Sequence, residues 1–199
     1  MVESSGLLNR RTSNRGTGGS NPPLSASFHA TARPGNFPQH ADNTTLPANH
    51  VSVITANGRH HVRAIRPFAP GETVLHLYGE PVPHPDRHTI QIDFAIHLGA
   101  ADLEHPGEFH PWRYLNHACE PNTVVHDRDL VAVQPLEAGA QVTFNYNTTE
   151  YDMAAPFQCH CGSTACIGEI RGFCHLDITE KRRLAPLLAP HLKRLLDLP

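Results

Sequence analysis

Hydrophobic residues from Val51 to about residue 146 occur in short runs separated by clusters of glycine, proline, aspartate and asparagine. Short apolar runs between turn signals are typical of β-strands, and no long stretch with helical spacing interrupts them. The pattern therefore predicts a mostly β domain. The segments that carry it are VSVI, HVRAI, TVLHLY, TIQIDFAIHL, TVV, LVAV and QVTFNY.

The segment TIQIDFAIHL, residues 89–98, shows the clearest alternation of apolar and other residues. Apolar residues on every second position predict one strand with one face on a core. Two segments between apolar runs, APGE (69–72) and EAGA (137–140), predict turns because glycine adopts backbone angles that other residues avoid. The alternating residues are Ile90, Ile92, Phe94, Ile96 and Leu98.

The segment DITEKRRLAPLLAPHLKRLLDL, residues 177–198, has the spacing of an amphipathic helix. Asp177 or Thr179 is placed to cap its start. Pro186 and Pro190 interrupt the pattern, so we expect two short pieces that pack onto the β domain. The leucines at helical spacing are Leu184, Leu187, Leu188, Leu192, Leu195 and Leu196.

Residues 1–50 differ from the rest of the chain. More than half of them are Ser, Thr, Asn, Gly or Pro, and their apolar residues follow no period. Such a segment buries too little apolar surface to offset its chain entropy, which predicts a disordered N-terminal tail.

Composition limits the binding partners and the cellular compartment that we expect for this protein. A formal net charge of -3 gives no strong field to attract nucleic acid or an anionic membrane. The chain has no apolar run of about eighteen residues to span a bilayer, and its first residues lack the apolar core of a secretory signal. We therefore expect an intracellular, cytoplasmic protein without direct nucleic-acid or membrane partners. The five cysteines agree, because an odd number does not complete a set of disulfides.

Four of the cysteines form a metal-ligand pattern. Cys159, Cys161 and Cys166 follow a C-x-C-x4-C spacing, and Cys119 is the natural fourth ligand. Four thiolates complete a tetrahedral zinc site without an open position, which makes the ion structural. Cys174 lies beyond this pattern and is interpreted as a buried spare thiol. The alternative is that the cysteines are unrelated core residues.

Other residues give weaker signals. The histidines follow no metal-ligand spacing such as H-E-x-x-H and are interpreted as scattered surface residues. Trp112 and Arg113 precede YLNHACEPN and are predicted to hold that loop in place. The histidines considered are His60, His61, His76, His84, His88, His97, His105 and His110.

Several motifs together carry a resemblance to a known family. NHACEPN (116–122), VTFNY (142–146) and CHCGSTAC (159–166) resemble, in this order, three signatures of SET-domain protein-lysine methyltransferases with a post-SET zinc segment. GRHHVRAIRPFAPGETVLHLYGE (58–80) is similar to the opening of that domain, so the likeness covers about residues 55–175.

The resemblance implies a fold and a domain plan. The fold is a β-rich SET domain in which the closing strand passes beneath the NHACEPN loop as a pseudoknot. It divides the chain into the tail, a SET domain with a variable insert, a post-SET zinc segment, and a C-terminal helical segment. These parts are residues 1–50, residues 51–150 with the insert at about 81–112, residues 151–175, and residues 176–199.

The resemblance also implies site residues. S-adenosylmethionine would bind on one face, with Asn116 holding its methionine part and the His117 backbone pairing with adenine. Tyr146 would be the active-site tyrosine, also near the cofactor, and Phe144 would stand beside the lysine amine, where a residue without a hydroxyl is linked with adding two or three methyl groups. Phe157 is a candidate to pack on the adenine.

The opening motif departs from the family, which has G-x-G where this chain has Arg59-His60-His61 beside Gly58. His61 then stands at the cofactor loop, and either non-glycine residues build that turn or the register shifts by one.

The resemblance implies an S-adenosylmethionine-dependent methyltransferase acting on the side-chain amine of lysine in a protein or peptide. The alternative is a catalytically silent, zinc-stabilised SET-like binding module, which the altered opening motif favours. Acidic residues of the insert either attract a basic peptide or belong to a solvated loop. They are Asp86, Asp102, Glu104 and Glu108.

Overall fold

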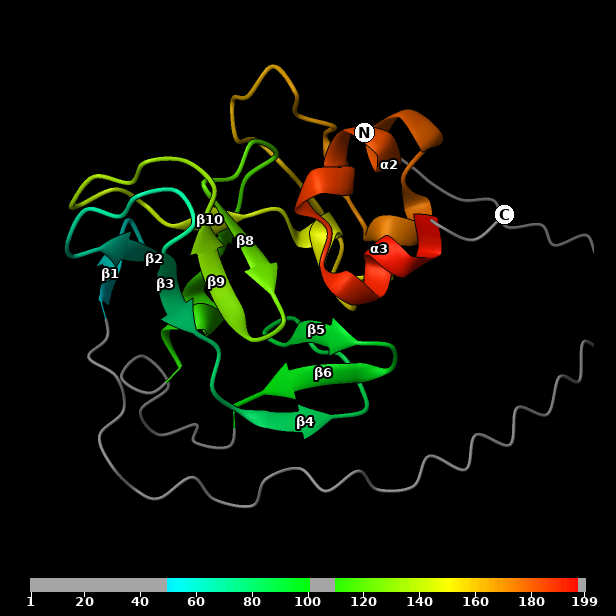
Figure 1. Cartoon of the computed structure of the whole chain (residues 1–199), viewed down its shortest axis with the longest axis horizontal. Coiled ribbons are helices and arrows are strands. Elements are labelled where there is room, and N and C mark those ends of the chain that lie inside the picture. The colour runs from blue at the N-terminus through cyan, green and yellow to red at the C-terminus, as the bar shows by residue number, and fades with distance from the viewer. Residues whose placement is uncertain (1–49, 101–109, 197–199) are drawn as a thin grey trace, which may run out of the picture. The chain divides into compact units, whose positions relative to one another are not determined.

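A computed structural model describes residues 50–100 and 110–196. The predicted tail, except for His50, lies outside these residues, as do Asp102, Glu104, His105 and Glu108. Short strands dominate the described residues, with two short α-helices near their end (Figure 1). The predicted mostly β fold class is therefore confirmed. No helix in residues 50–100 or 110–196 is long and apolar enough to cross a membrane.

The described strands pair into small sheets and not into one large one. A hairpin, two three-stranded sheets and two short pairs make up the set, in the orders β1-β2, β3-β9-β8, β4-β6-β5, β10-β7 and β11-β12. The strands are β1 (Val51–Ala56), β2 (Arg59–Ala64), β3 (Thr73–His76), β4 (Glu80–Val82), β5 (Ile90–Asp93), β6 (Ile96–Gly99), β7 (Asn116–His117), β8 (Thr123–His126), β9 (Asp129–Ala132), β10 (Thr143–Phe144), β11 (Phe157–Gln158) and β12 (Glu169–Ile170).

One pairing joins the two motifs on which the predicted pseudoknot depends. β7 and β10 pair in parallel, with Thr143 opposite Asn116 and Phe144 opposite His117. A parallel pair needs a long crossover between its strands, and here β8 and β9 lie in that connection. The closing VTFNY segment thus runs alongside NHACEPN, as the pseudoknot requires.

The prediction of a single strand over residues 89–98 is wrong. The segment is a hairpin, in which β5 and β6 are antiparallel and Asp93 lies opposite Ile96. Ala95 adopts a positive φ of 54°, and the Asp93 side chain accepts a hydrogen bond from the Phe94 N–H. This turn reverses the chain, so Phe94 is 46% exposed although its position in the alternation predicts burial.

Glycine allows the predicted turns. Gly71 and Gly139 have φ values of 88° and 84°, and both lie in the predicted APGE and EAGA turns, which are confirmed. The two turns lie near each other because Phe68 and Leu136 exchange backbone hydrogen bonds of 2.9 and 3.0 Å.

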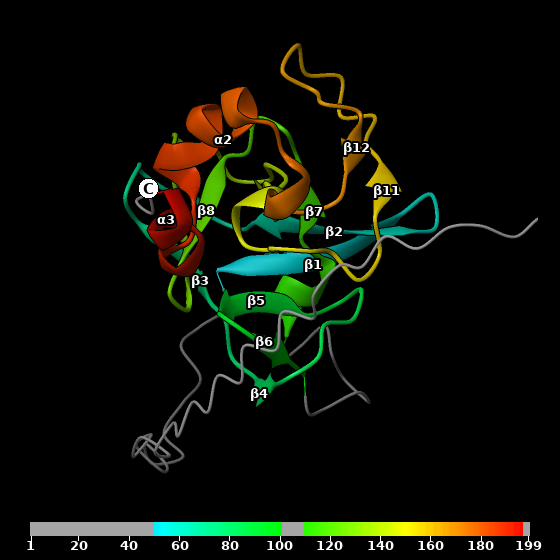
Figure 2. The same cartoon turned by 90° about the vertical axis from the view of Figure 1, so that its right-hand side faces the viewer.

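The C-terminal segment forms two short helices, as predicted. α2 (Ile178–Leu184) and α3 (Pro190–Leu196) are separated by the 3-10 turn η4 (Ala185–Leu187), which contains Pro186. Asp177 caps α2 by accepting a hydrogen bond of 2.8 Å from the Glu180 N–H. The two helices lie beside β8 (Figure 2). The buried leucines of this C-terminal segment pack with Phe173, and these are Leu184, Leu188 and Leu192.

Trp112 anchors the segment before NHACEPN. It lies in the 3-10 turn η1 (Pro111–Tyr114), is 1% exposed, and donates from Nε1 to the Tyr78 carbonyl at 2.8 Å. His110 also contacts that carbonyl, at 3.1 Å from Nδ1. The predicted role of Trp112 is confirmed. The prediction of surface histidines is wrong for His97 and His110, which are both buried in the folded domain.

Candidate functional site

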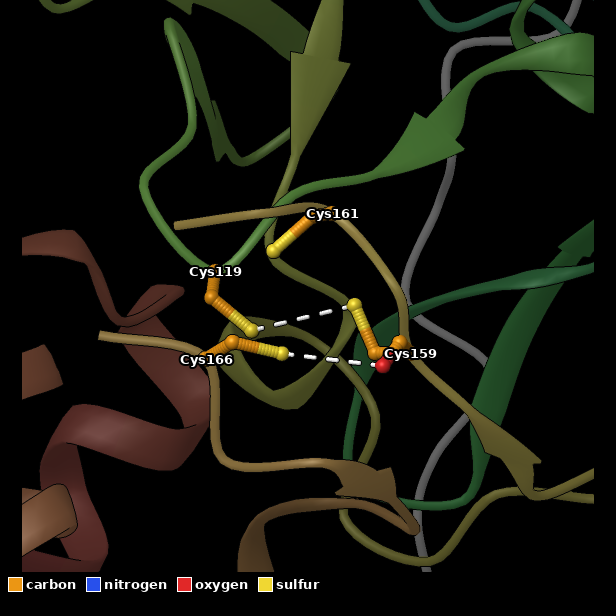
Figure 3. A group of neighbouring side chains, drawn as sticks. All are labelled: Cys119, Cys159, Cys161 and Cys166. Carbon is orange, nitrogen blue, oxygen red and sulfur yellow. Dashed lines mark hydrogen bonds between the residues drawn. The ribbon is translucent and has the colours of Figure 1, made fainter. Parts of the chain in front are cut away.

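The four predicted cysteines lie together. The sulfurs of Cys119, Cys159, Cys161 and Cys166 are all within 4.8 Å of one another, and those of Cys119 and Cys159 are 4.0 Å apart. Figure 3 shows Cys119 on one segment and the other three on another, with their sulfurs turned toward a shared space. A tetrahedral zinc with bonds of about 2.3 Å separates its sulfurs by about 3.8 Å, so the four thiols fit such an ion.

Short local contacts shape the cysteine segment. Gly162, with φ 76°, turns the chain between Cys161 and Cys166, and the Cys159 N–H donates to the Gly168 carbonyl at 2.6 Å. Ser163 donates to the Glu120 carboxylate at 2.5 Å, which ties this segment to the residue after Cys119. The cluster is therefore held from both segments by contacts besides the thiols themselves.

The pKa values of Cys119 and Cys161 are shifted in opposite directions. Burial raises the pKa of Cys119, and the neighbouring Cys159 and Cys161 thiols raise it further. At Cys161 burial raises the pKa, but hydrogen bonds to the backbone of Cys119 and Ser163, together with those to the Cys159 and Cys166 thiols, outweigh it and bring the value to about 6. Four adjacent thiolates repel one another without a cation, and metal ligation requires them deprotonated.

Cys174 lies outside this cluster, as predicted, but it is only partly buried. Its sulfur is near Asp152 and His175, and His175 Nε2 lies 2.9 Å from the Asp152 carboxylate.

Asn116 contacts the opening hairpin. Its Nδ2 donates to the His60 carbonyl at 2.9 Å and lies 3.2 Å from Nδ1 of His61. These histidines belong to β2, which follows a tight turn at Asn57 and Gly58 with φ values of 53° and 71°. Among the residues that the structure describes, Oδ1 of Asn116 has no hydrogen-bond partner. The amide thus faces the segment that stands where the family that the motifs resemble has G-x-G.

His117 joins the NHACEPN strand to the closing motif. Its Nδ1 accepts a hydrogen bond of 3.1 Å from the Tyr146 N–H, and its Nε2 lies 3.3 Å from the Cys119 sulfur. Burial lowers the pKa of His117 to about 4, so the ring is neutral near pH 7. Its ring packs edge-on against Tyr146 and Phe157, with centroids 5.3 and 5.7 Å away.

Phe144 and Tyr146 form an aromatic pair. Their ring centroids are 4.8 Å apart, and Phe144 is 3% exposed in the main core. The Tyr146 hydroxyl donates to the Leu115 carbonyl at 2.5 Å. Burial, followed by the Glu150 carboxylate, raises the pKa of Tyr146. The phenol therefore stays protonated near neutral pH.

The fold brings the predicted site residues into two connected groups. His61 contacts Asn116, and His117 contacts Tyr146 and Phe157. β7 joins the groups because Asn116 and His117 are its two residues. Sequence reasoning missed the His60 and Leu115 carbonyls, because main-chain atoms at a site leave no residue-type signal. It also missed Glu150, the buried acid four residues after Tyr146.

A separate hollow of about 320 Å³ lies between β8 and the C-terminal helices. None of the predicted site residues lines it. Its wall includes Val124, Val125, Leu188 and Lys193.

Comparisons with known proteins bear on this arrangement. No protein-family model matches the chain. The chain is 39% identical over 88 residues to methyltransferase flvH of Aspergillus flavus, which covers 42% of this chain and 48% of that protein. It is 35% identical over 85 residues to an H3 lysine-36 specific histone-lysine N-methyltransferase of Chaetomium globosum, which covers 39% of this chain and 9% of that protein. It is 26% identical over 157 residues to histone-lysine N-methyltransferase ash1 of Drosophila melanogaster, which covers 70% of this chain and 7% of that protein.

Among solved structures, the chain is similar to KRYPTONITE in complex with mCHG DNA and SAH, with a TM-score of 0.42 and 18% identity over 58% of this chain and 27% of that one. The sequence relatives confirm the resemblance that the motifs indicate. This chain is related to SET-domain protein-lysine methyltransferases. It spans about half the length of the Aspergillus flavus relative and a small part of the histone-lysine N-methyltransferases.

Proposed function

We propose that this protein is an S-adenosylmethionine-dependent methyltransferase that modifies the side-chain amine of lysine in a protein or peptide. The observation that carries the proposal is the parallel pairing of β7 with β10. It sets Asn116 and His117, the proposed cofactor residues, beside Phe144 and Tyr146, the proposed lysine-site residues. Methyl transfer requires this adjacency, because the donor and the amine must meet in line.

The cofactor side of the site has suitable groups. Oδ1 of Asn116, without a partner among residues 50–100 and 110–196, is an acceptor for the ammonium of a methionine moiety. The His117 backbone and the Phe157 ring would hold the adenine, and His61 would border the same face. S-adenosylmethionine would supply a methyl group already activated on a sulfonium, so these residues need only bind and orient it.

The lysine side must favour a neutral amine. A lysine of pKa about 10.4 costs roughly 4 kcal/mol to deprotonate at pH 7, and apolar surroundings reduce this cost because they disfavour the ammonium. The buried Phe144 ring and the adjacent Tyr146 ring would supply those surroundings. Phe144 offers no hydroxyl to hold a water beside the amine, which leaves room for more than one methyl group.

Zinc fits the cysteine cluster. Cys119, Cys159, Cys161 and Cys166 would hold one ion with no open coordination position, so zinc would not take part in the chemistry. Its role would be to hold the CHCGSTAC segment against the loop that follows His117. This fixes Phe157, two residues before Cys159, near the proposed adenine site.

Two measurements test the proposal. The full chain is incubated with methyl-labelled S-adenosylmethionine and a cell lysate, and modified peptides are identified by mass spectrometry. Calorimetry with S-adenosylmethionine measures cofactor binding in parallel. We expect label on lysine side chains and measurable binding heat. Label on other residue types, or none, would contradict the assigned reaction.

One observation favours a second candidate, a silent binding module. The side chains of His60 and His61 occupy the segment where the related family has glycine, and His60 packs against Tyr114 with ring centroids 4.6 Å apart. If this segment blocks the cofactor face, the protein will take up zinc but give no heat with S-adenosylmethionine.

A further inference from the structure

Buried polar residues lie on both sides of the proposed catalytic tyrosine, Tyr146. Asn145, Asn147, Thr148, Thr149 and Glu150 are each 7% exposed or less. Buried polar groups are costly unless they are hydrogen-bonded, so a run of this length needs partners from other segments. We call residues 145–151 the polar hub.

The polar hub is bonded to the C-terminal part of the chain. The Asn147 side chain accepts from the Gly172 N–H at 2.9 Å. The Thr148 carbonyl accepts from the Ala189 N–H, and the Glu150 carbonyl from the Phe173 N–H, both at 2.8 Å. These hydrogen bonds provide partners for buried polar groups of the hub, but they do not involve the Glu150 carboxylate.

That carboxylate is bonded to the insert instead. Glu150 Oε1 accepts from the Gln91 N–H of β5 at 2.8 Å, and the Gln91 side-chain oxygen accepts from the Tyr151 N–H at 2.8 Å. Gln91 also donates from Nε2 to the Asp93 carbonyl at 3.2 Å, which fixes its side chain. Within the described part of the chain, these two reciprocal bonds are the ones that join the β4-β6-β5 sheet to the polar hub.

Glu150 is also hydrogen-bonded to Tyr146 through the backbone. The Glu150 N–H donates to the Tyr146 carbonyl at 2.9 Å. A displacement of β5 would therefore be transmitted through two hydrogen bonds to the turn that carries the tyrosine. Gln91 and Glu150 are 4% and 7% exposed, so water cannot readily replace either partner.

We propose that Glu150 and Gln91 are a pair of positioning residues that fixes the turn carrying Tyr146, a residue of the proposed lysine site, relative to the insert sheet. The inference rests on the proposed methyltransferase function. Neither residue touches the reacting atoms. The pair matters because a misplacement of about 1 Å in a bound substrate can lower its rate about a hundredfold.

Hydrogen exchange tests the hydrogen bonds of Glu150 and Gln91 without a measurement of enzyme activity. Glu150→Ala removes the acceptor of the Gln91 N–H, and Gln91→Ala removes the acceptor of the Tyr151 N–H. We expect the amide affected in each variant to exchange at least tenfold faster than in the wild type. Glu150→Gln keeps an acceptor oxygen and should stay within threefold of the wild type.

Kinetics then test the positioning role. The probe is a synthetic peptide that spans the methylated lysine identified in the lysate experiment. In Glu150→Ala and Gln91→Ala we expect kcat/KM for this peptide to fall at least tenfold, while calorimetric affinity for S-adenosylmethionine changes less than threefold. The matched control is Glu72→Ala, which removes another carboxylate that accepts a backbone N–H, that of Ala69, in a turn outside the site.

The outcomes separate the inference from the function on which it rests. Faster exchange with unchanged kinetics would overturn the positioning role, and unchanged exchange in folded variants would overturn the pair itself. If Glu150→Ala fails to fold, the exchange and kinetic measurements on Gln91→Ala decide the question. If the wild type transfers no label, the proposed function fails, and exchange still decides whether the pair holds the insert in place.

Discussion

Tyr146 is held by its backbone N–H and by its hydroxyl. Its backbone N–H donates to His117 and its hydroxyl donates to the Leu115 carbonyl at 2.5 Å. The hydroxyl is therefore fixed in a direction set by Leu115, the residue before NHACEPN. A fixed hydroxyl can orient a reacting group without being rearranged during the reaction, which is how preorganised polar groups lower barriers.

The substitution Tyr146→Phe should therefore slow methyl transfer and leave cofactor binding nearly unchanged. We expect turnover to fall by about two orders of magnitude or more, the usual effect of removing one preorganised donor, while S-adenosylmethionine binding stays within about threefold. Single-turnover kinetics and calorimetry measure the two effects. Thermal unfolding of the variant is the control, because the Leu115 carbonyl loses its partner. Unchanged turnover would exclude Tyr146 from the mechanism.

Glu150 should make stability depend on pH. Burial raises the pKa of Glu150 from 4.5 to about 7, against the opposing effect of its bonds to Gln91 and Thr149. The folded state then holds a proton that the unfolded state has lost between these pH values. Stability from this group is present below pH 4.5 and is lost as pH rises toward 7.

The measurement compares the wild type with Glu150→Gln, which does not titrate. The free energy of unfolding of the wild type minus that of the variant should fall by roughly 3 kcal/mol or less between pH 4.5 and 7. Above about pH 8 the difference should be constant. A difference that is flat across the whole range would show that Glu150 titrates normally.

At the scale of elements, the β4-β6-β5 sheet depends on close backbone packing. Gly79 precedes β4 with φ 153°, and a Cβ at this position would collide with the Gly99 carbonyl of β6. Gly71 also has a positive φ, of 88°, but a Cβ there would meet no atom within 4 Å. Substitutions at these two glycines therefore distinguish the free-energy cost of a positive φ from the cost of a steric collision.

Gly79→Ala should destabilise the protein clearly more than Gly71→Ala. For Gly71→Ala we expect about 1 kcal/mol, the cost of a positive φ for a residue with a Cβ. For Gly79→Ala the collision with backbone adds to this, and amides of β4 and β6 should lose protection from exchange. Chemical denaturation and hydrogen exchange provide the measurements. Equal effects of the two substitutions would mean that β4 adjusts freely.

The predictions for these elements succeeded where local chemistry decides the outcome. The APGE and EAGA turns and the Asp177 cap follow from the backbone preferences of a few residues. The hairpin at 89–98 was missed because Asp93, Phe94 and Ala95 carry no glycine, and the Ala95 turn is held by its surroundings. Alternation alone cannot distinguish one strand from two that fold back.

At the scale of the whole molecule, the cysteine cluster joins distant parts of the chain. Cys119 follows β7, whereas the other three cysteines lie between β11 and β12. Arg183 of α2 donates to the Cys119 carbonyl at 3.5 Å, so the C-terminal helices contact the same loop. Loss of a metal from this cluster would release several elements together.

Removal of metal should therefore unfold more than the cysteine segment. We expect purified protein to contain one zinc per chain, and a chelator to cost stability on the order of 10 kcal/mol, as for structural zinc sites. Metal analysis and thermal unfolding test this. Cys161→Ser should lower zinc content, whereas Cys174→Ser, outside the cluster, should not. Stable protein without metal would contradict the assignment.

The sequence by itself determined the mostly β class, the turns, the two helical pieces and the four cysteines, because periodicity, backbone preference and ligand spacing act over a few residues. Tertiary structure alone decided that His97 and His110 are buried and that Phe94 is exposed. It also decided that Gln91 meets Glu150, 59 residues away. Such contacts depend on how separate sheets pack, and residue type at either position does not specify its partner.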